Sequence, residues 1–74
     1  MENKILELLD KEYQGLEFEV EFKEFRLYVI KFKIEKTIQE FLYKWDNTLS
    51  DNINIDIISK MINNKIVEYY KGGF

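Results

Sequence analysis

The feature that most constrains the fold is the segment 16–23, in which apolar and charged side chains alternate without exception. Side chains on a β-strand point alternately to its two faces, so this period of two predicts a strand with one face on a core and the other in water. The apolar set is Leu16, Phe18, Val20 and Phe22, and the charged set is Glu17, Glu19, Glu21 and Lys23.

A second strand is predicted over 27–35, antiparallel to the first. The best register places Phe18 opposite Phe32 on the apolar face and Glu19 opposite Lys31 on the charged face. A slip of one residue would set the apolar row beside the lysines, so the apolar face fixes the register. The tip is then the three residues 24–26, which lack the glycine expected in a left-handed position, so a longer loop or a bulge is the alternative to this turn.

The predicted register leaves an apolar patch on the solvent face near the tip. Leu27 and Val29 lie there beside the acidic row, with Phe25 at the end of the hairpin. Either a bulge near Val29 rotates both residues inward, or another protein molecule covers them. The candidate partner-binding residues are Phe25, Arg26, Leu27, Val29, Glu17, Glu19 and Glu21.

Three helices are predicted around this hairpin. The segment 2–13 carries Ile5, Leu8 and Leu9 on one stripe and ends before Gly15. The segment 38–46 follows Thr37 and Glu40, which have capping-box spacing. Its apolar arc is Ile38, Phe41, Leu42 and Trp45, with Tyr43 pointing away from it, either as an ordinary exposed aromatic residue or as part of a contact surface.

The third predicted helix covers 55–71, with Asn54 as its N-cap and glycines after it. Besides its main apolar stripe, the helix has a second ridge formed by Ile57 and Met61. Because a simple surface helix needs only one apolar stripe, the ridge packs either on the helix predicted over 38–46 or on another chain, which makes it a candidate dimer contact.

The predicted fold is therefore a small single α+β domain over residues 1–74, in the order α-β-β-α-α, with an antiparallel hairpin packed on helices. A two-stranded sheet is marginal and leaves two open edges. We accordingly expect a homodimer, formed either by edge-to-edge pairing into a four-stranded sheet or through the Ile57 and Met61 ridge.

The composition argues against an enzyme or a metalloprotein. The chain has no cysteine and no histidine, which removes the commonest metal ligand, acid/base and thiol groups. The oxygen-rich segment 46–54 resembles a calcium loop only loosely, because Asp51 stands where the turn glycine belongs and Ile57 where the bidentate glutamate belongs. We therefore expect no catalytic residue, no metal and no cofactor.

Charge and hydropathy restrict the partners. The net charge is −3, and residues 1–24 hold eight acids and three bases, a balance of −5. Such a chain has little means of neutralising phosphates, so nucleic-acid binding is not expected. No apolar run approaches the roughly 18 residues that span a bilayer. The row of Glu17, Glu19 and Glu21 is either an ion-paired strand face or a phosphate mimic offered to a DNA-binding protein.

These patterns favour a small, acidic, non-enzymatic module that binds another protein. The chain lacks alanine and proline and is rich in Ile, Lys and Asn, as AT-rich coding sequence would impose. We thus expect a cytoplasmic protein of a low-GC bacterium or its phage, for example an inhibitor of a host protein of the anti-defence or anti-CRISPR type. The alternatives are a nucleic-acid-binding accessory factor and a structural or assembly subunit.

Overall fold

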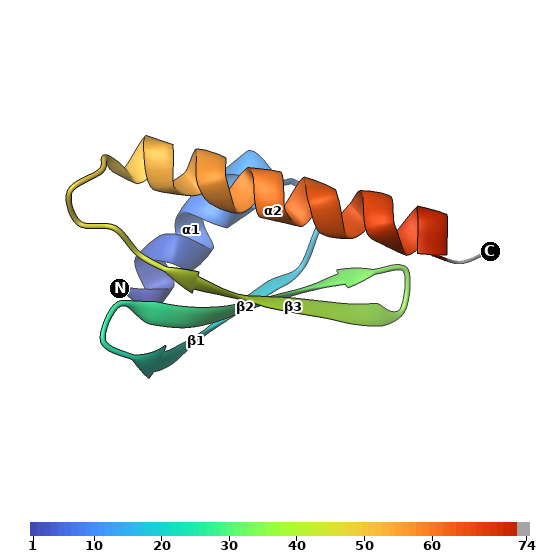
Figure 1. Ribbon diagram of the computed structural model, residues 1–74, viewed down its shortest axis with the longest axis horizontal. Coiled ribbons are helices and arrows are strands. Elements are labelled where there is room, and N and C mark those ends of the chain that lie inside the picture. Colours follow the sequence, from blue (N-terminus) through green and yellow to red (C-terminus); the bar gives the residue numbers. More distant parts are fainter. Residues whose placement is uncertain (73–74) are drawn as a thin grey trace.

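The structure is a computed structural model that describes residues 1–72. Its elements are α1 (Glu2–Glu12), β1 (Phe18–Glu24), β2 (Leu27–Ile34), β3 (Thr37–Lys44) and α2 (Asp51–Gly72). The strands form one antiparallel sheet in the order β1-β2-β3, and both helices lie on the same side of it (Figure 1). The chain is therefore a small α+β fold, as predicted, but its order is α-β-β-β-α.

The predicted pairing of the first hairpin is confirmed: Phe18 lies opposite Phe32 and Val20 opposite Ile30. Near the tip, Lys23 is an extra residue on β1, so Glu24 pairs with Leu27 and the turn contains only Phe25 and Arg26. The prediction of a three-residue tip is therefore wrong. Arg26 takes the left-handed conformation expected of a glycine, with φ of 59°. β1 begins two residues later and ends one residue later than its predicted bounds of 16–23, whereas β2 begins at residue 27 as predicted and ends one residue before 35.

The predicted helix over 38–46 is wrong, and with it the order α-β-β-α-α. This segment forms β3, which pairs with β2 without interruption from Ile34 opposite Thr37 to Leu27 opposite Lys44. A turn of two residues connects the strands, in which Glu35 has a φ of 57°. Thr37 therefore lies in a strand rather than at the cap of a helix.

The residues of this segment fit both the period of a helix and the period of a strand, and in the structure they form a strand. Its apolar residues fit a helical stripe, but every second residue from Gln39 to Trp45 also lies on one strand face. Three of those four residues are aromatic, a residue type that strands favour, and pairing with β2 satisfies a main-chain edge that would otherwise be open. Tyr43, expected to point away from the packed arc, is instead buried.

The helices differ from the prediction mainly at their N-terminal or C-terminal turns. α1 ends at Glu12, with extended Tyr13 after it, rather than at residue 13. α2 starts at Asp51 instead of 55, and Ser50 caps it by accepting a hydrogen bond from the Ile53 N–H at 3.2 Å. Asn54 is therefore not the N-cap: it lies within the first turns of α2 and is fully buried.

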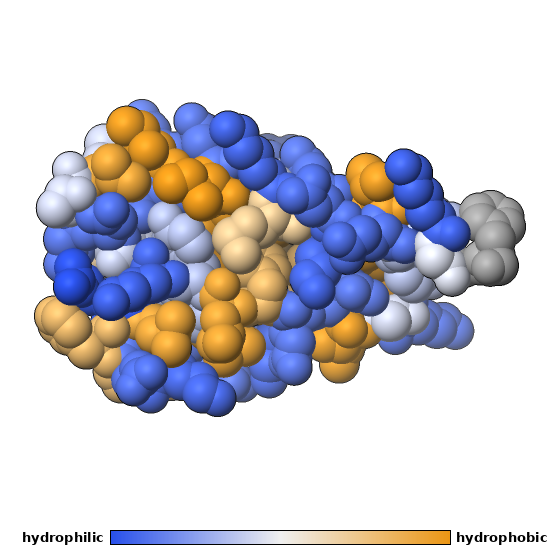
Figure 2. Space-filling model, in the orientation of Figure 1, coloured by the Kyte–Doolittle hydropathy of each residue, from blue (hydrophilic) through white to orange (hydrophobic). Residues whose placement is uncertain are grey.

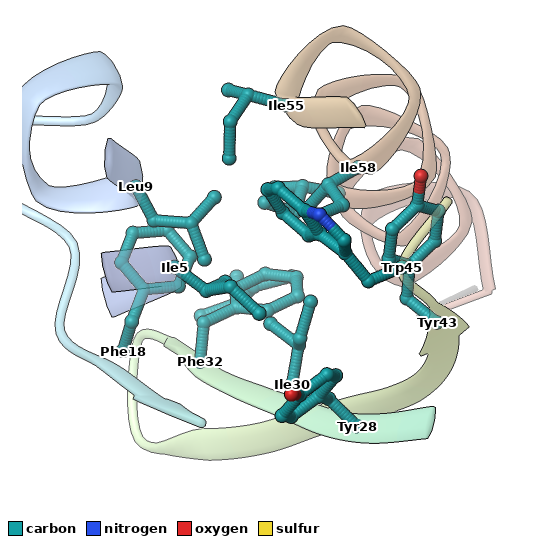
Figure 3. Packing of buried hydrophobic residues seen from close by; sticks show 12 residues of the cluster. Ile5, Leu9, Phe18, Tyr28, Ile30, Phe32, Tyr43, Trp45, Ile55 and Ile58 are labelled. Carbon is teal, nitrogen blue, oxygen red and sulfur yellow. The ribbon is translucent and has the colours of Figure 1, made fainter. Parts of the chain in front are cut away.

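The core fills the space between the sheet and the two helices (Figure 3). α1 and the residue that follows it also contact α2: Lys4 pairs with Asp51 at 2.9 Å, and the Tyr13 hydroxyl donates to the Ser59 carbonyl at 3.3 Å. Within residues 1–72, neither helix combines the length and apolar character needed to cross a bilayer. The buried apolar residues are Ile5, Leu9, Phe18, Tyr28, Ile30, Phe32, Ile34, Tyr43, Trp45, Ile55, Ile58 and Ile62.

Candidate protein-binding face of the sheet

The side of the sheet opposite the helices is here called the outer face, and no helix within residues 1–72 packs on it (Figure 1). Strand alternation places every second side chain there, since the intervening residues of β2 are buried in the core. The outer face consists of Glu19 and Glu21 from β1, Leu27, Val29, Lys31 and Lys33 from β2, and Ile38, Glu40, Leu42 and Lys44 from β3.

An apolar row crosses the outer face near the Phe25–Arg26 turn. Val29 lies between Glu21 on β1 and Leu42 on β3, and Leu42 is 51% exposed. The bulge lies on β1 at Lys23, not near Val29, so Leu27 and Val29 are not rotated into the core. The apolar patch predicted from the sequence is therefore present, and Leu42 enlarges it.

Next to this row lies a charged row centred on Lys31. Its Nζ donates to Glu21 Oε1 at 3.1 Å, while Glu19 and Glu40 are its cross-strand neighbours. The hydrogen bond and charge of Glu21 raise the pKa of Lys31, and the charges of Glu40 and Glu19 add to that effect. One ammonium group thus stands among three carboxylates, which leaves the row with a negative balance.

Two depressions mark the outer face on either side of Glu40. One has a volume of about 500 Å³ and extends from Glu17 and Glu19 to Ile38. The other, of about 520 Å³, extends from Glu21 to Leu42 across Val29. Acidic, basic and apolar side chains line both depressions, with Lys31 and Lys33 in the first and Lys23 in the second; no group of three metal-ligating side chains occurs in residues 1–72.

The predicted binding residues fall into two groups. Phe25 is 74% exposed at the turn, and the Arg26 guanidinium lies 4.7 Å from the centre of its ring. The turn is anchored to β3 because the Trp45 N–H donates to the Arg26 carbonyl at 2.7 Å. Glu21, Leu27 and Val29 adjoin this end of the sheet, whereas Glu17 and Glu19 lie toward the other end.

The predicted ridge on α2 is partly covered by the chain itself. Ile57 and Met61 are half-buried and pack against the core. Met61 also lines a shallow depression of about 200 Å³ beside Phe41 of β3. The ridge therefore faces the free edge of the sheet.

The sequence reasoning missed the contribution of β3 to the outer face, namely Ile38, Glu40, Leu42 and Lys44. The signal was present, because these residues alternate with the aromatic row in the same segment. The charge asymmetry along the chain gains a spatial meaning from the structure. α1 packs against β1, so the acid-rich residues 1–24 form neighbouring elements at one edge of the molecule.

The fold and the outer face described above rest on the sequence and the structure of this chain. Comparison with protein-family models, with curated protein sequences and with solved structures finds no match.

Proposed function

We propose that this chain is a non-enzymatic protein-binding module that holds its partner on the outer face of the sheet. The observation that carries the proposal is the placement of both helices on one side of the sheet (Figure 1), since apolar side chains on the other side are then exposed. Leu42 is 51% exposed and Ile38 is 61% exposed on that side. Exposed apolar side chains beside a polar rim are typical of protein interaction sites.

The acidic β1 side of the outer face favours a partner protein with a basic rim around an apolar centre. Glu21 adjoins the apolar row, and Glu19 and Glu17 follow it along the β1 side of the sheet. Within residues 1–72, the short ion pair of these carboxylates is the one between Glu21 and Lys31. An opposing surface rich in Lys and Arg would complement these charges and accelerate association. A nucleic acid would meet the same carboxylates with repulsion, which disfavours that alternative.

The biological class in this proposal is an inhibitor of a host protein, encoded by a phage or mobile element and acting in the cytoplasm of a low-GC bacterium. Its support is compositional: a short acidic chain without alanine or proline and rich in Ile, Lys and Asn. A partner with a basic groove, such as a nucleic-acid-binding protein of a defence system, would fit the acidic row.

The test compares two variants with the same change in charge. The first converts Glu17, Glu19 and Glu21 to Gln on the β1 side of the sheet. The second converts exposed α1 residues instead, Glu7→Gln, Asp10→Asn and Glu12→Gln. Unmodified protein and both variants are immobilised at equal density, and proteins captured from bacterial lysate are quantified by mass spectrometry.

The proposal expects a basic protein that the unmodified chain and the α1 variant capture equally and that the β1 variant loses by at least about tenfold. Capture should also decrease as salt increases, because exposed charges are screened. Circular dichroism verifies that both variants are folded. A protein captured equally by the β1 variant, or lost only by the α1 variant, contradicts the proposal.

A further inference from the structure

The free edge of β3 is defined by the direction of its main-chain groups. The Trp45 N–H donates to the Arg26 carbonyl, which identifies the odd-numbered residues of this segment as those bonded to β2. In an antiparallel strand the alternate residues point their N–H and C=O groups the other way. These outward-pointing groups belong to Ile38, Glu40, Leu42 and Lys44.

The two edges of the sheet differ in how they are protected. On β1, Lys23 forms a bulge, and the Glu2 carboxylate approaches the outward Phe22 N–H at 3.4 Å. Bulges and covering segments are the usual means of preventing edge-to-edge association. β3 has eight residues, pairs with β2 in continuous register and contains no proline, glycine or bulge. Its free edge is therefore the better template for another strand.

We propose that β3 pairs antiparallel with β3 of a second copy of this chain, with Leu42 on the two-fold axis. The two three-stranded sheets then form one sheet of six strands. This register places Glu40 directly opposite Lys44 of the second copy, and the symmetry repeats that pair on the other side of the axis. The interaction requires no third protein and is independent of the function proposed above.

Charge complementarity selects this register among those that the outward main-chain groups allow. With Glu40 on the axis, two carboxylates would face each other directly, an arrangement that destabilises a strand pair. With Leu42 on the axis, the apolar side chains meet and both charged residues find opposite partners. The outer face then carries a continuous apolar row: Val29 and Leu42, followed by Leu42 and Val29 of the second copy.

The helix side of β3 supports the same partner. Phe41 and Met61 are only half-buried although they pack against the core, and both line the depression at this edge. Figure 2 shows apolar residues gathered between α2 and the strands beneath it. The proposed register places Phe41 opposite Tyr43 of the second copy. Dimerisation therefore extends the aromatic row and covers the depression beside Phe41 and Met61.

The first experiment measures the mass of the unmodified chain by sedimentation at concentrations from about 1 to 300 μM, which cover typical weak to moderate self-association. The proposal expects a dimer at the upper end. The variant Leu42→Pro should be monomeric throughout, because its ring removes an outward N–H donor while sparing every bond to β2. A circular dichroism spectrum like that of the unmodified chain confirms that the variant is folded.

The second experiment tests the register by disulfide formation, for which the cysteine-free chain is well suited. Cysteines at position 42 would have Cα atoms about 5.5 Å apart across the axis, within the range of a disulfide. Cysteines at position 38 would lie about 27 Å apart along the strands. Leu42→Cys should therefore form a covalent dimer at least about tenfold faster than Ile38→Cys under the same oxidant.

Two outcomes would overturn the proposal: a mass of 9.1 kDa for the unmodified chain at every concentration, or equal rates of crosslinking for the two cysteine variants. Faster crosslinking of Glu40→Cys than of Leu42→Cys would also contradict it, because that result places Glu40 on the axis.

Discussion

A single buried amide connects the sheet to α2. Asn54 Oδ1 accepts hydrogen bonds from the Tyr43 hydroxyl at 2.5 Å and the Asp46 N–H at 3.0 Å. Its Nδ2 donates to the carbonyls of Asp46 at 2.9 Å and Ser50 at 3.1 Å. Both ends of the amide are satisfied, so burial of this polar side chain fixes the loop between β3 and α2 instead of weakening the core.

Replacing Asn54 with Ala should lower the free energy of unfolding by about 2–4 kcal/mol, because it leaves buried polar groups without partners and creates a cavity. Urea denaturation measures the change. Asn52→Ala is the matched control: this side chain is exposed on the same helix, and its replacement should cost less than about 0.5 kcal/mol. Equal effects of the two substitutions would show that the Asn54 bonds contribute little.

The neighbouring Asp46 makes the loop sensitive to acid. The Thr48 hydroxyl and N–H both donate to Asp46 Oδ1, which lowers the pKa of this carboxyl. A depressed pKa in the folded state gives stability that is present above the unfolded value of about 3.9. That stability is lost as the pH falls through the folded pKa.

In the variant Thr48→Val the pKa of Asp46 should rise toward its ordinary value, because the hydroxyl donor is removed while the main-chain donor remains. A carboxyl-detected NMR titration of both proteins measures the shift. An unchanged Asp46 pKa in the variant would mean that the hydroxyl does not hold the carboxylate in solution.

At the scale of elements, both hairpins turn through two residues without using glycine. In each turn one residue larger than glycine has a positive φ, Arg26 in the first and Glu35 in the second. This conformation is unfavourable in free energy for an L-residue that carries a side chain. Each turn is held from outside: the Arg26 carbonyl bonds to Trp45, and the Tyr69 hydroxyl donates to Glu35 Oε2 at 3.1 Å.

Glu35→Gly should raise the free energy of unfolding by about 0.5–1 kcal/mol, because glycine adopts positive φ without steric cost. In this variant, the free energy gained by relieving the positive φ is larger than the free energy lost with the exposed hydrogen bond from Tyr69. The next residue provides a control of opposite sign: Lys36 has no positive φ, so Lys36→Gly should lower stability by about 0.5–1 kcal/mol. Thermal unfolding of both variants tests the pair, and destabilisation by Glu35→Gly would contradict the assignment of strain.

The sequence predicted β1, β2 and their register because alternation of apolar and charged residues leaves only one sensible pairing. It failed for β3 because the apolar residues at 38, 41, 42 and 45 have the spacing of a helical stripe, while the aromatic residues at 41, 43 and 45 have the spacing of a strand face. The local pattern does not distinguish a helix from a strand here. The open edge of β2 does, because pairing with it requires a strand. The role of Asn54 was also hidden, since an amide near a helix start reads as a cap unless the preceding loop is known.

Leu27, Val29, Glu19 and Glu21 were placed on the solvent face from the register alone, and they lie there. The residues supplied by β3 were missed together with that strand. Lys31 was expected only as an ion-pair partner on that face, whereas the structure surrounds it with Glu19, Glu21 and Glu40.

At the scale of the whole molecule, the chain is elongated, with extents of 40 × 22 × 18 Å. α2 accounts for this shape: it has 22 residues, so it is about 33 Å long, and it extends past the turn between β2 and β3 (Figure 1). One sheet of three strands supports both helices, and a thin core lies between the sheet and the helices. Within residues 1–72, no second layer covers the other side of the sheet. A layer of this kind leaves a large surface relative to its volume.

The consecutive order of the strands also determines how the chain reaches this structure. Each strand pairs with its immediate neighbour through a short turn, so the sheet closes only small loops and pays little chain entropy. The hydrogen bond from Tyr13 to Asn63, by contrast, joins residues 50 positions apart. We expect the hairpins to form early, within microseconds, and the two helices to meet late in folding. During that interval the edge of β3 is exposed without α2 beside it.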